Sequence, residues 1–400
     1  MSGLQIPNPR ERALVRAADI ATAPFSWFRT RSAPAGAIRR VLLLRLERIG
    51  DLLMVLDAIS EARAAWPDAE IDLAVGSWNL QIAKLVGGVT NVHVLDVPWL
   101  ARGDAADGWP ALIRKARAWR SRSYDLAINF EPDIRSNFLM WQSGARARHG
   151  YWTGGGRAFL TDAIAYEPEK HVSVNARTLV ARAADMQAAG AALKRGSAPA
   201  GRRLVLPPDA KGRAIELVGQ GRRPLVGVHA SGGRESKQWH LDRFADVARE
   251  LARQRNATIV LTGSESDRPL VDKVAARLGG VSTLNLCGEL DLVDLAAVLA
   301  SLDVFVTGDT GPMHLASAVS TPVVALFGPA DPRRYGPTSP RQRVIRVDLP
   351  CSPCGMVRLP PERCRGHVPD CMDGIQVGAV VKAALDLLDE TVPVRQTAVD

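Results

Sequence analysis

The sequence predicts an α/β protein with two parallel sheets, each covered by helices. Short branched-apolar runs alternate with longer segments of helical spacing, in two successive sets. Strands that alternate with helices form parallel sheets flanked by those helices. A stretch rich in Pro and Gly, residues 198–201 and then Pro207 and Pro208, separates the two sets. We therefore expect two Rossmann-like domains that face each other across a cleft.

The first set falls within residues 38–205 and is expected to form the N-terminal domain. Its expected strands are residues 39–46, 71–75, 92–95 and 126–129. Residues 51–66 have helical spacing, which predicts one helix directly after the first strand.

The second set, residues 206–348, is expected to form the C-terminal domain. Its expected strands are residues 225–229, 258–262, 303–306 and 322–327. Residues 349–400 hold a cysteine-rich segment and a final helix with an apolar face.

Residues 1–37 form a basic N-terminal extension, with Phe25, Trp27 and Phe28 clustered together. The extension could be an amphipathic helix on a membrane surface or an arm packed on the first domain. We favour the arm.

Composition limits the function. The 400 residues are 46% hydrophobic and 23% charged, as in an ordinary globular protein of about two domains. No apolar run is long enough for a membrane span, and no secretory signal is recognisable, so we expect a cytoplasmic protein. The net charge of +9 suits a nucleotide, a phosphorylated glycan or an anionic membrane face, including peripheral contact with the inner membrane. No nucleic-acid-binding motif is present, and we expect no nucleic-acid partner.

The segment 304–335 is the most informative part of the sequence. It reads as a buried strand, a turn with Asp309, Thr310 and Gly311, and a short helix that opens with a proline. The first N–H groups of a helix have no intrahelical partner, and the helix dipole adds positive charge there, so this turn can bind an anion. His314 follows one turn into the helix. The alternative is a plain strand–helix connection capped by Asp309 or Thr310.

A Gly-Asp pair follows the first expected strand. Gly50 allows a sharp turn, and Asp51 falls at the cap of the next helix. Because ligands of parallel sheets bind beyond the carboxyl ends of the strands, Asp51 is a candidate for chemistry. The alternative is an ordinary N-cap. Glu47 and Asp133 are the rival carboxylates near this edge.

A glycine-rich loop follows the first strand of the second set. Small residues such as Ser231 and Gly232 let backbone N–H groups approach a phosphate, and Lys237 adds a positive charge. The alternative is a flexible loop with a surface lysine. After the next strand, Glu265 is either a ligand-binding carboxylate or a helix cap.

Absent motifs exclude several enzyme classes. The sequence has no G-x-G-x-x-G after a strand and no G-x-x-x-x-G-K-[ST], which disfavours dehydrogenases and P-loop NTPases. It also lacks Asp-x-Asp, a motif that holds a metal on a diphosphate. Lys237 and the helix starting at Pro312 could neutralise a diphosphate instead.

Four cysteines are concentrated near the C-terminus. Cys351, Cys354, Cys364 and Cys371 share one short segment, while Cys287 stands alone. Four thiolates suit zinc or iron, and a site closed by four protein ligands is structural rather than catalytic. The alternatives are free thiols or a disulfide, which a reducing cytoplasm disfavours.

Residues 309–316, read DTGPMHLA, together with Thr321-Pro322 and the LFG of 326–328, resemble the signature of glycosyltransferase family nine. That family includes the lipopolysaccharide heptosyltransferases and has the two-domain GT-B fold. The resemblance extends over roughly residues 38–390. It implies that the N-terminal domain binds the acceptor and the C-terminal domain binds the nucleotide-sugar.

The resemblance also implies roles for the candidate residues. Asp51 matches the aspartate proposed as the family's catalytic base. Glu47 stands where the family usually has a smaller residue, which puts the acceptor geometry in question. The residues that match the nucleotide-sugar site are Ser231, Gly232 and Lys237 for the diphosphate, Glu265 for the ribose or base, and Asp309, Thr310, Gly311 and His314 for the pocket. Some autotransporter heptosyltransferases use a similar cysteine-rich tail to hold iron.

We therefore expect an inverting glycosyltransferase that needs no metal for its chemistry. Its expected donor is ADP-heptose, and its expected acceptor is a lipopolysaccharide core or a related glycan. The alternatives are a protein O-heptosyltransferase, a nucleotide-sugar epimerase of the same fold and a non-catalytic nucleotide-sugar binder.

Overall fold

A computed structural model describes residues 4–6, 8–24, 37–100, 107–187 and 204–390. The chain divides into two compact units, Met1–Arg203 and Leu204–Asp400. Each unit is described by itself. The aromatic residues 25–28 and the breaker-rich stretch 198–201 lie outside the described residues.

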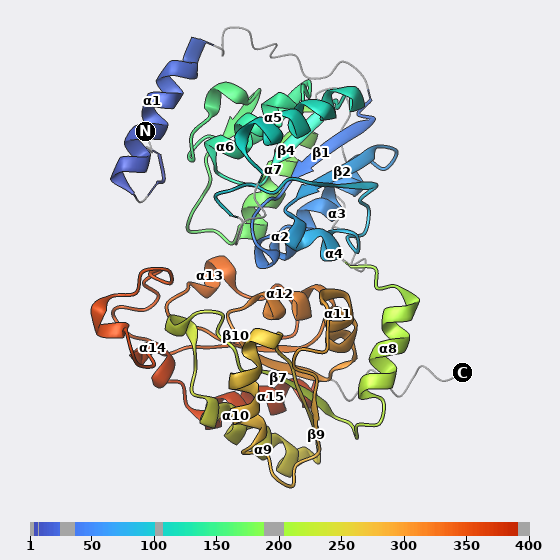
Figure 1. Cartoon of the computed structure of the whole chain (residues 1–400), viewed down its shortest axis with the longest axis vertical. Coiled ribbons are helices and arrows are strands. Elements are labelled where there is room, and N and C mark those ends of the chain that lie inside the picture. Colours follow the sequence, from blue (N-terminus) through green and yellow to red (C-terminus); the bar gives the residue numbers. More distant parts are fainter. Residues whose placement is uncertain (1–3, 7, 25–36, 101–106, 188–203, 391–400) are drawn as a thin grey trace. The chain divides into compact units, whose positions relative to one another are not determined.

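The first unit is built on a six-stranded parallel sheet with the order β3-β2-β1-β4-β5-β6 (Figure 1). Its strands are β1 (Arg40–Leu44), β2 (Glu70–Val75), β3 (Asn91–Val94), β4 (Leu126–Asn129), β5 (Ala147–Tyr151) and β6 (Asp162–Ile164). Its α-helices are α1 (Pro9–Thr22), α2 (Ile49–Met54), α3 (Leu56–Ala65), α4 (Leu80–Ala83), α5 (Trp109–Ala118), α6 (Ile134–Gln142) and α7 (Val172–Gln187).

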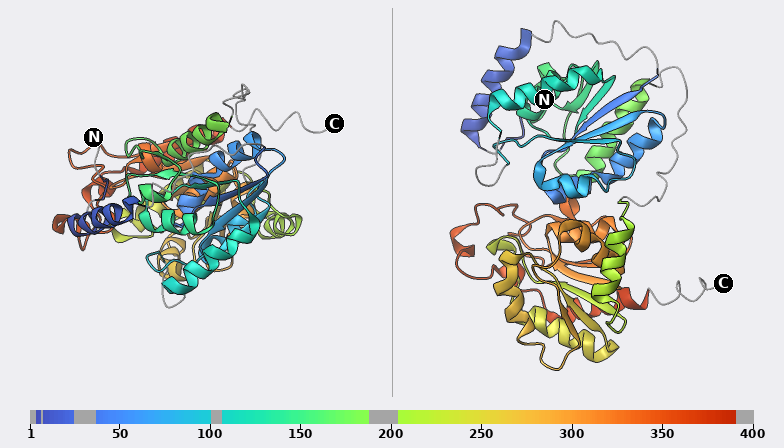
Figure 2. Two further views of the ribbon diagram at one scale, coloured as in Figure 1. Left: turned by 90° about the horizontal axis from the view of Figure 1, so that it is seen from above. Right: turned by 45° about the vertical axis from the view of Figure 1, so that its right-hand side comes forward.

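Helices cover the sheet of the first unit, as the two turned views show (Figure 2). Leu42 and Leu44 of β1 share one apolar cluster with Leu112 of α5 and Leu139 of α6. Alternate residues of a strand point to opposite faces of the sheet. Leu43, which points the other way, is also fully buried. β1 therefore has no polar face after its first residue, as expected for the centre of a parallel sheet covered on both sides.

The single helix predicted over residues 51–66 is wrong in detail. The chain forms α2 and α3, which are separated at Val55, where φ is −101° and ψ is 5°. Hydrophobic spacing continues through this break, since Leu53, Val55 and Leu56 are all buried. Periodicity alone could not show the interruption because both helices bury the same kind of residue.

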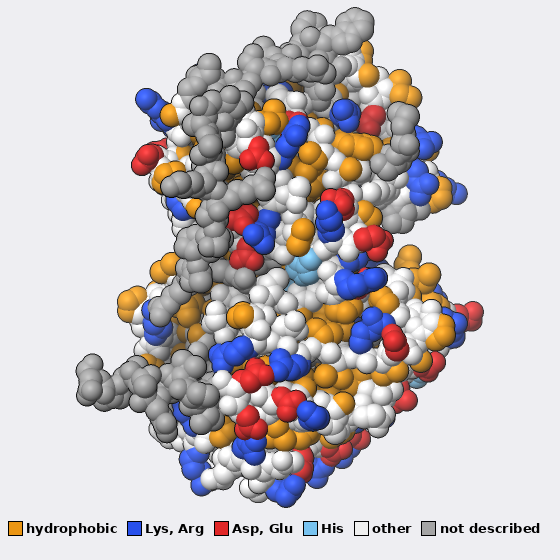
Figure 3. Space-filling view, turned by 180° about the vertical axis from the view of Figure 1, so that it is seen from behind, with side chains coloured by type: hydrophobic (Ala, Val, Ile, Leu, Met, Phe, Trp, Pro, Cys, Tyr) orange, Lys and Arg blue, Asp and Glu red, His pale blue; other side chains and the backbone are white. Residues whose placement is uncertain are grey.

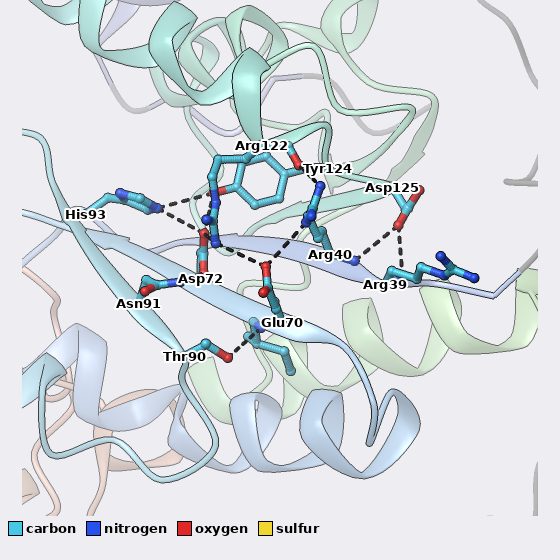
Figure 4. A network of polar contacts seen from close by, with 11 residues as sticks. Arg39, Arg40, Glu70, Asp72, Thr90, Asn91, His93, Arg122, Tyr124 and Asp125 are labelled. Atoms are coloured by element: carbon cyan, nitrogen blue, oxygen red, sulfur yellow. Dashed lines mark hydrogen bonds and ion pairs between the residues drawn. The ribbon is translucent and has the colours of Figure 1, made fainter.

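A polar network joins the beginnings of the central strands (Figure 4). The buried carboxylate of Asp72 accepts hydrogen bonds from Tyr124 Oη at 2.6 Å and Asn91 Nδ2 at 2.8 Å. It also lies 3.1 Å from His93 Nε2 and 3.2 Å from Arg122 Nη2. Burial opposes ionisation, yet these partners lower the pKa of Asp72 to about 2. The network fastens three strands at the edge opposite to the one where ligands of such sheets bind.

The described part of the N-terminal extension is an arm on the first unit, as predicted. Asp19 in α1 accepts a hydrogen bond from Gly156 N at 2.7 Å. Gly155 lies so close to Val15 that a Cβ atom at residue 155 would be 2.3 Å from Val15 Cγ1. Among the described helices, none has both the length and the apolar character needed to cross a bilayer.

The second unit repeats the topology of the first, with the order β12-β11-β10-β7-β8-β9 (Figure 1). Its strands are β7 (Leu225–His229), β8 (Thr258–Leu261), β9 (Thr283–Asn285), β10 (Val304–Gly308), β11 (Val323–Leu326) and β12 (Gln342–Ile345). Its α-helices are α8 (Pro208–Val218), α9 (Leu241–Arg255), α10 (Arg268–Ala275), α11 (Leu292–Ser301), α12 (Gly311–Ala318), α13 (Pro332–Tyr335), α14 (Asp370–Asp373) and α15 (Val377–Asp389).

The last helix completes the core of the second unit. Val380, Ala384 and Leu387 of α15 join the cluster that contains Val226 of β7 and Val306 of β10. The apolar face predicted for the final helix is therefore buried against this sheet.

Both sheets reverse their strand order between two central strands. In the first unit the reversal lies between β1 and β4, and in the second between β7 and β10. In open parallel sheets, ligands bind at such a reversal, beyond the carboxyl ends of the strands. The loops that follow these four strands are therefore where a site is expected.

Candidate active site

Arg45 follows β1 directly and is almost completely buried. Its Nη1 atom donates to Phe130 O at 2.7 Å and lies 2.8 Å from Glu47 Oε2. Its Nη2 atom lies 3.5 Å from Asp51 Oδ1, and its Nε donates to Asp51 O at 3.2 Å. Burial opposes the charged form, but Glu47, Asp51 and Glu131 raise the pKa of Arg45, so it stays a cation. One guanidinium thus fixes the turn after β1 to the end of β4.

Asp51 is the third residue of α2 and not its cap, which corrects the prediction. The helix begins one turn earlier because Arg48 takes the extended cap conformation. Asp51 Oδ2 accepts a hydrogen bond from Arg48 N at 3.2 Å, which satisfies an N–H group before the helix. The other oxygen faces Arg45, and 28% of the side chain is exposed. The carboxylate is held from two sides and still reaches solvent.

Glu131 holds the same turn from the neighbouring strand. It lies two residues beyond β4 and is buried. Its Oε1 atom accepts a short hydrogen bond from Leu46 N and a second one, of 3.1 Å, from Glu47 N. A carboxylate that accepts several backbone N–H bonds is strongly oriented. Glu131 therefore fixes the backbone that leads to Asp51.

The carboxylates around Arg45 have unusual proton affinities. Burial is the main cause that raises the pKa of Glu47 to about 8, and the charges of Asp51 and Glu131 add to it. Burial likewise raises the pKa of Glu131 to about 7, with Arg45 opposing the shift. A carboxyl with a pKa near 8 is a poor base at neutral pH because most of it is already protonated. Glu47 is therefore a weaker candidate base than its position alone suggests.

Asp133, the other rival carboxylate, is fully engaged. It caps α6 by accepting from Arg135 N at 2.7 Å. Its two oxygens also accept from Arg135 Nε at 3.0 and 3.1 Å. A bidentate arginine partner satisfies most of the lone pairs of a carboxylate. Glu47 and Asp51 are both partly exposed, by 33% and 28% of their side chains. The raised pKa of Glu47 makes Asp51 the stronger candidate base of the two.

In the second unit, Lys237 joins the loops that follow β7 and β10. It lies in a short 3₁₀ turn (Glu235–Lys237), and its Nζ atom donates to Asp309 O at 2.5 Å. The same Nζ lies 3.2 Å from Asp309 Oδ2. The sequence predicted both residues as donor ligands, and the structure brings them together at the reversal of strand order.

The turn after β10 leads into a helix, as predicted, but α12 begins one residue before the predicted start at Pro312. Thr310 is the N-cap, and Gly311 begins the helix. Thr310 Oγ1 lies 3.2 Å from Thr307 Oγ1 and 3.4 Å from Gly308 O. His314 follows in the first turn and is buried. The first N–H groups of α12 and the Lys237 ammonium are thus a pair of positive features on one edge of the sheet.

The loop after β7 is more constrained than predicted. Gly232 N donates to Gln238 Oε1 at 2.8 Å, and a Cβ on Gly232 would lie 2.7 Å from Lys237 C. The glycine is therefore required by the close approach of the backbone at Lys237. Ser231 of this loop also bonds to Asp267, which lies after the neighbouring strand β8. Burial alone would raise the pKa of Asp267, but the hydrogen bonds from Ser264 and Ser231 lower it. Contact of Ser231 and Gly232 with a diphosphate stays a prediction.

Glu265 lies at the start of a 3₁₀ turn (Glu265–Asp267) after β8, and 71% of its side chain is exposed. Its Oε1 and Oε2 atoms accept from Arg268 at 2.8 and 2.6 Å. The N-cap is the preceding Ser264. The helix-cap alternative for Glu265 is therefore wrong, and its role toward a ribose or base stays a prediction.

The cysteine-rich segment, which we define as residues 349–376, contains four neighbouring free thiols. Cys371 is buried, Cys364 is half-buried, and Cys351 and Cys354 are exposed. Burial and the nearby thiols of the other three raise the pKa of Cys371 to about 11. In the described chain no three Cys, His, Asp or Glu side chains converge as the ligands of one ion do. The type of these donors fits zinc or iron, while their arrangement in the described chain does not bring three of them to one point.

Two functional residues were missed by the sequence analysis. Arg45 and Glu131 had no predicted role, although both stand at strand ends. An arginine between Leu44 and Leu46, inside an apolar run, was the available signal. A charge in such a run must be buried, and a buried charge requires partners.

The net positive charge is not gathered into one large patch on the face that Figure 3 shows, where Lys and Arg side chains are interspersed with Asp and Glu. Among the described residues many charges are paired, as are Arg223 with Asp303 and Arg255 with Asp389. A broad electrostatic surface for a polyanion is not apparent on this face. Local groups such as Lys237 are better candidates for anion binding.

Comparison with known proteins agrees with this geometry. The family model described as glycosyltransferase family 9 (heptosyltransferase) matches residues 112–359. The lipopolysaccharide core heptosyltransferase OpsX of Haemophilus influenzae is 23% identical over 322 residues, which are 78% of this chain and 85% of that protein. Lipopolysaccharide heptosyltransferase 2 of Salmonella typhimurium is 26% identical, over 77% of this chain and 88% of its own.

Solved structures share the fold. A glycosyl transferase family 9 protein of Veillonella parvula superposes with a TM-score of 0.76 and 21% identity, covering 90% of this chain and all of that one. The ADP-heptose lps heptosyltransferase II of E. coli gives a TM-score of 0.70, also with 21% identity, over 88% and 99%. The predicted GT-B class of α/β fold is confirmed.

Proposed function

The chain belongs to glycosyltransferase family 9, and from that membership we propose that it transfers heptose from ADP-heptose to a lipopolysaccharide core. The two relatives named above are lipopolysaccharide heptosyltransferases, and each matches more than three quarters of this chain. The observation that carries the proposal is the contact of Lys237 with Asp309 beside the start of α12. Asp309 offsets the Lys237 ammonium in this contact, so a diphosphate would take the ammonium over from Asp309 and bind the N–H groups at the start of α12, without a metal ion.

The donor is assigned to the second unit. A diphosphate carries its charge on several oxygens, and backbone N–H groups at a helix start bind such oxygens well. Lys237 would add a mobile ammonium, and Thr310 a hydroxyl. When the sugar leaves, negative charge grows on the terminal phosphate, so the same groups would stabilise the transition state more than the ground state.

The base is assigned to the first unit. In an inverting transfer, an acceptor hydroxyl attacks the anomeric carbon from the face opposite ADP. The new C–O bond forms as the bond to phosphate breaks, ADP leaves with the electron pair, and the hydroxyl proton passes to a base. We assign the role of this base to Asp51. Arg45 and Arg48 N orient its carboxylate, and part of the side chain is still exposed.

Product analysis tests the proposal. The protein is incubated with ADP-heptose, with and without heptose-deficient lipopolysaccharide core. Transfer that requires this acceptor supports the proposal, whereas a changed donor without acceptor would indicate an epimerase. Transfer to a protein hydroxyl, with none to the core, would indicate a protein O-heptosyltransferase.

Thr310→Val is expected to weaken ADP-heptose binding while the protein stays folded. The change keeps the size of the side chain and removes the hydroxyl, and a hydrogen bond to a charged group is worth about 1.5–3 kcal/mol. Isothermal titration measures the affinity. Thr283→Val, in the edge strand β9 and with its hydroxyl on Val281 O, is the control and should bind like the wild type. Equal affinities for both variants would contradict the role of Thr310.

We further propose that the protein works in the cytoplasm, at the surface of the inner membrane, since its proposed acceptor is a membrane glycolipid. A vesicle co-sedimentation assay with anionic lipid would test the membrane contact.

A structural metal in the cysteine-rich segment is also proposed, with zinc or iron as the ion. The support is the cluster of thiols around Cys371, whose pKa the other three raise. Cys351, Cys354, Cys364 and Cys371 would supply the ligands, and their side chains would have to turn toward one point. Such an ion would stabilise the fold and take no part in the transfer.

Cys354→Ser is expected to lower the metal content from about one equivalent to near zero and to lower the melting temperature. Loss of one of four ligands removes most of the binding free energy of a structural site. Elemental analysis and thermal denaturation measure both effects, with Cys287→Ser as the control outside the segment. A wild-type protein without metal, whose four thiols all titrate in the native state, would overturn this proposal.

A further inference from the structure

The cysteine-rich segment is attached to the loop that follows β11. Ser352 Oγ donates to Gly328 O at 2.8 Å, and Gly355 N donates to Pro329 O at 2.8 Å. Cys371, in α14, packs against the same turn, because a Cβ on Gly328 would be 3.1 Å from Cys371 Sγ. The Cys371 thiol and the residues beside Cys351 and Cys354 are therefore packed against a loop at the carboxyl edge of the sheet.

The segment is also attached to the loop that follows β7. Ser236 Oγ donates to Val357 O at 3.0 Å, and Ser236 is buried. The next residue is Lys237, whose ammonium contacts Asp309 after β10. Because β10 lies between β11 and β7, the segment holds the loops on both sides of the strand that carries Asp309.

A short path leads from a thiol to this contact. Cys354 Sγ accepts a hydrogen bond from Met356 N at 3.4 Å. Val357, the next residue, accepts from Ser236 through its carbonyl oxygen and donates through its N–H to Gly355 O at 2.9 Å. A change at Cys354 that displaces residues 355–357 therefore displaces the partner of Ser236.

We propose that the cysteine-rich segment is part of the nucleotide-sugar site, with Ser236 as the residue that positions Lys237. The proposal rests on the proposed function, because it assumes that Lys237 binds the donor diphosphate. It adds that chemical modification of the thiols, of Cys354 above all, lowers the affinity for nucleotide. Coupling between two sites is reciprocal in free energy, so bound nucleotide must also restrain the thiols.

The test is alkylation of the full-length protein by N-ethylmaleimide, with and without saturating ADP, after any bound metal has been removed with a chelator so that Cys354 is a free thiol. The thiol sulfur adds to the maleimide double bond, and the thiol proton ends on the adjacent carbon. Mass spectrometry gives the rate for each cysteine. We expect ADP to slow modification of Cys354 by about fivefold or more, and alkylated protein to bind ADP more weakly by a similar factor.

Three variants separate positioning from simple shielding. Ser236→Ala should still bind ADP, with reduced affinity, and should lose the protection of Cys354 at saturation. Ser236→Thr keeps a hydroxyl and should restore protection. Ser301→Ala, whose hydroxyl bonds to Ala297 O within α11, is the matched control and should behave like the wild type.

The outcomes are distinguishable. Binding of ADP without any change in the alkylation rate would overturn the inference alone. Full protection in Ser236→Ala would overturn the route through Ser236. A wild-type protein whose melting temperature does not respond to ADP would overturn the proposed donor, and this inference with it.

Discussion

Asp51→Asn is expected to lower kcat by about 10²–10⁴-fold and to leave the affinity for ADP-heptose unchanged. General-base catalysis typically contributes that factor. Asparagine has the size of aspartate, and its amide oxygen can still accept from Arg48 N, so α2 should keep its start. Steady-state kinetics and donor titration on the same preparation measure the two quantities.

The neighbouring carboxylates provide the controls for this result. Asp133→Asn removes a carboxylate that Arg135 already occupies, so its kcat should fall far less. Glu47→Gln removes a group whose pKa is raised to about 8, and it should also retain more activity than Asp51→Asn. If Asp51→Asn transfers heptose within tenfold of the wild type, the base is not Asp51.

Arg45→Met is expected to reduce the free energy of unfolding by about 3–5 kcal/mol, because it leaves the buried Glu131 and the partly exposed Glu47 and Asp51 without their cation. Methionine replaces the length of the side chain but none of its hydrogen bonds to Phe130 O and Asp51 O. Arg40→Met is the matched control. Arg40 lies at the other end of β1, and its ion pair with Glu70 is exposed, so the loss there should be about 1 kcal/mol or less.

The effect of Arg45→Met should depend on pH. In the wild type, Glu47 and Glu131 have pKa values of about 8 and about 7, both above the ordinary 4.5. A raised folded-state pKa means that stability is greatest below about pH 4.5 and falls as pH rises toward the folded value. Arg45 opposes this shift, so its removal should make the fall steeper. Denaturant unfolding of the wild type and of Arg45→Met at pH 5 and pH 8 measures this dependence. If the variant loses the same free energy of unfolding at both pH values, Arg45 acts through packing alone.

The sequence predicted the fold because its signals are local. Alternating strands and helices, with glycine at the strand ends, recur within a few residues of each other and need no knowledge of distant contacts. Strands such as β4 and β7 were predicted to the residue. The half-exposed edge strands β6, β9 and β12, and the polar β5 with its Arg148, were missed because they lack a buried apolar run.

The sequence also predicted the turn that we propose to bind the nucleotide-sugar donor. Asp309, Thr310 and Gly311 are adjacent in the chain, and the helix that follows them forms where it was expected. Their chemistry depends on a helix start, which is a local feature. The sequence therefore determined by itself that this turn is an anion-binding candidate and which family it resembles.

Only the tertiary structure decided which distant residues contact the candidate site residues and how strongly each carboxylate binds its proton. Glu131 contacts the backbone of Leu46 across 85 residues, and Ser236 contacts Val357 across 121. Such pairs depend on strand order and on how loops pack at the carboxyl edge, which periodicity does not encode. Burial then sets the proton affinity of each carboxylate, because desolvation acts on a position in space. The order of the strands, and not the spacing of residues, placed Arg45, Asp51 and Glu131 in one network.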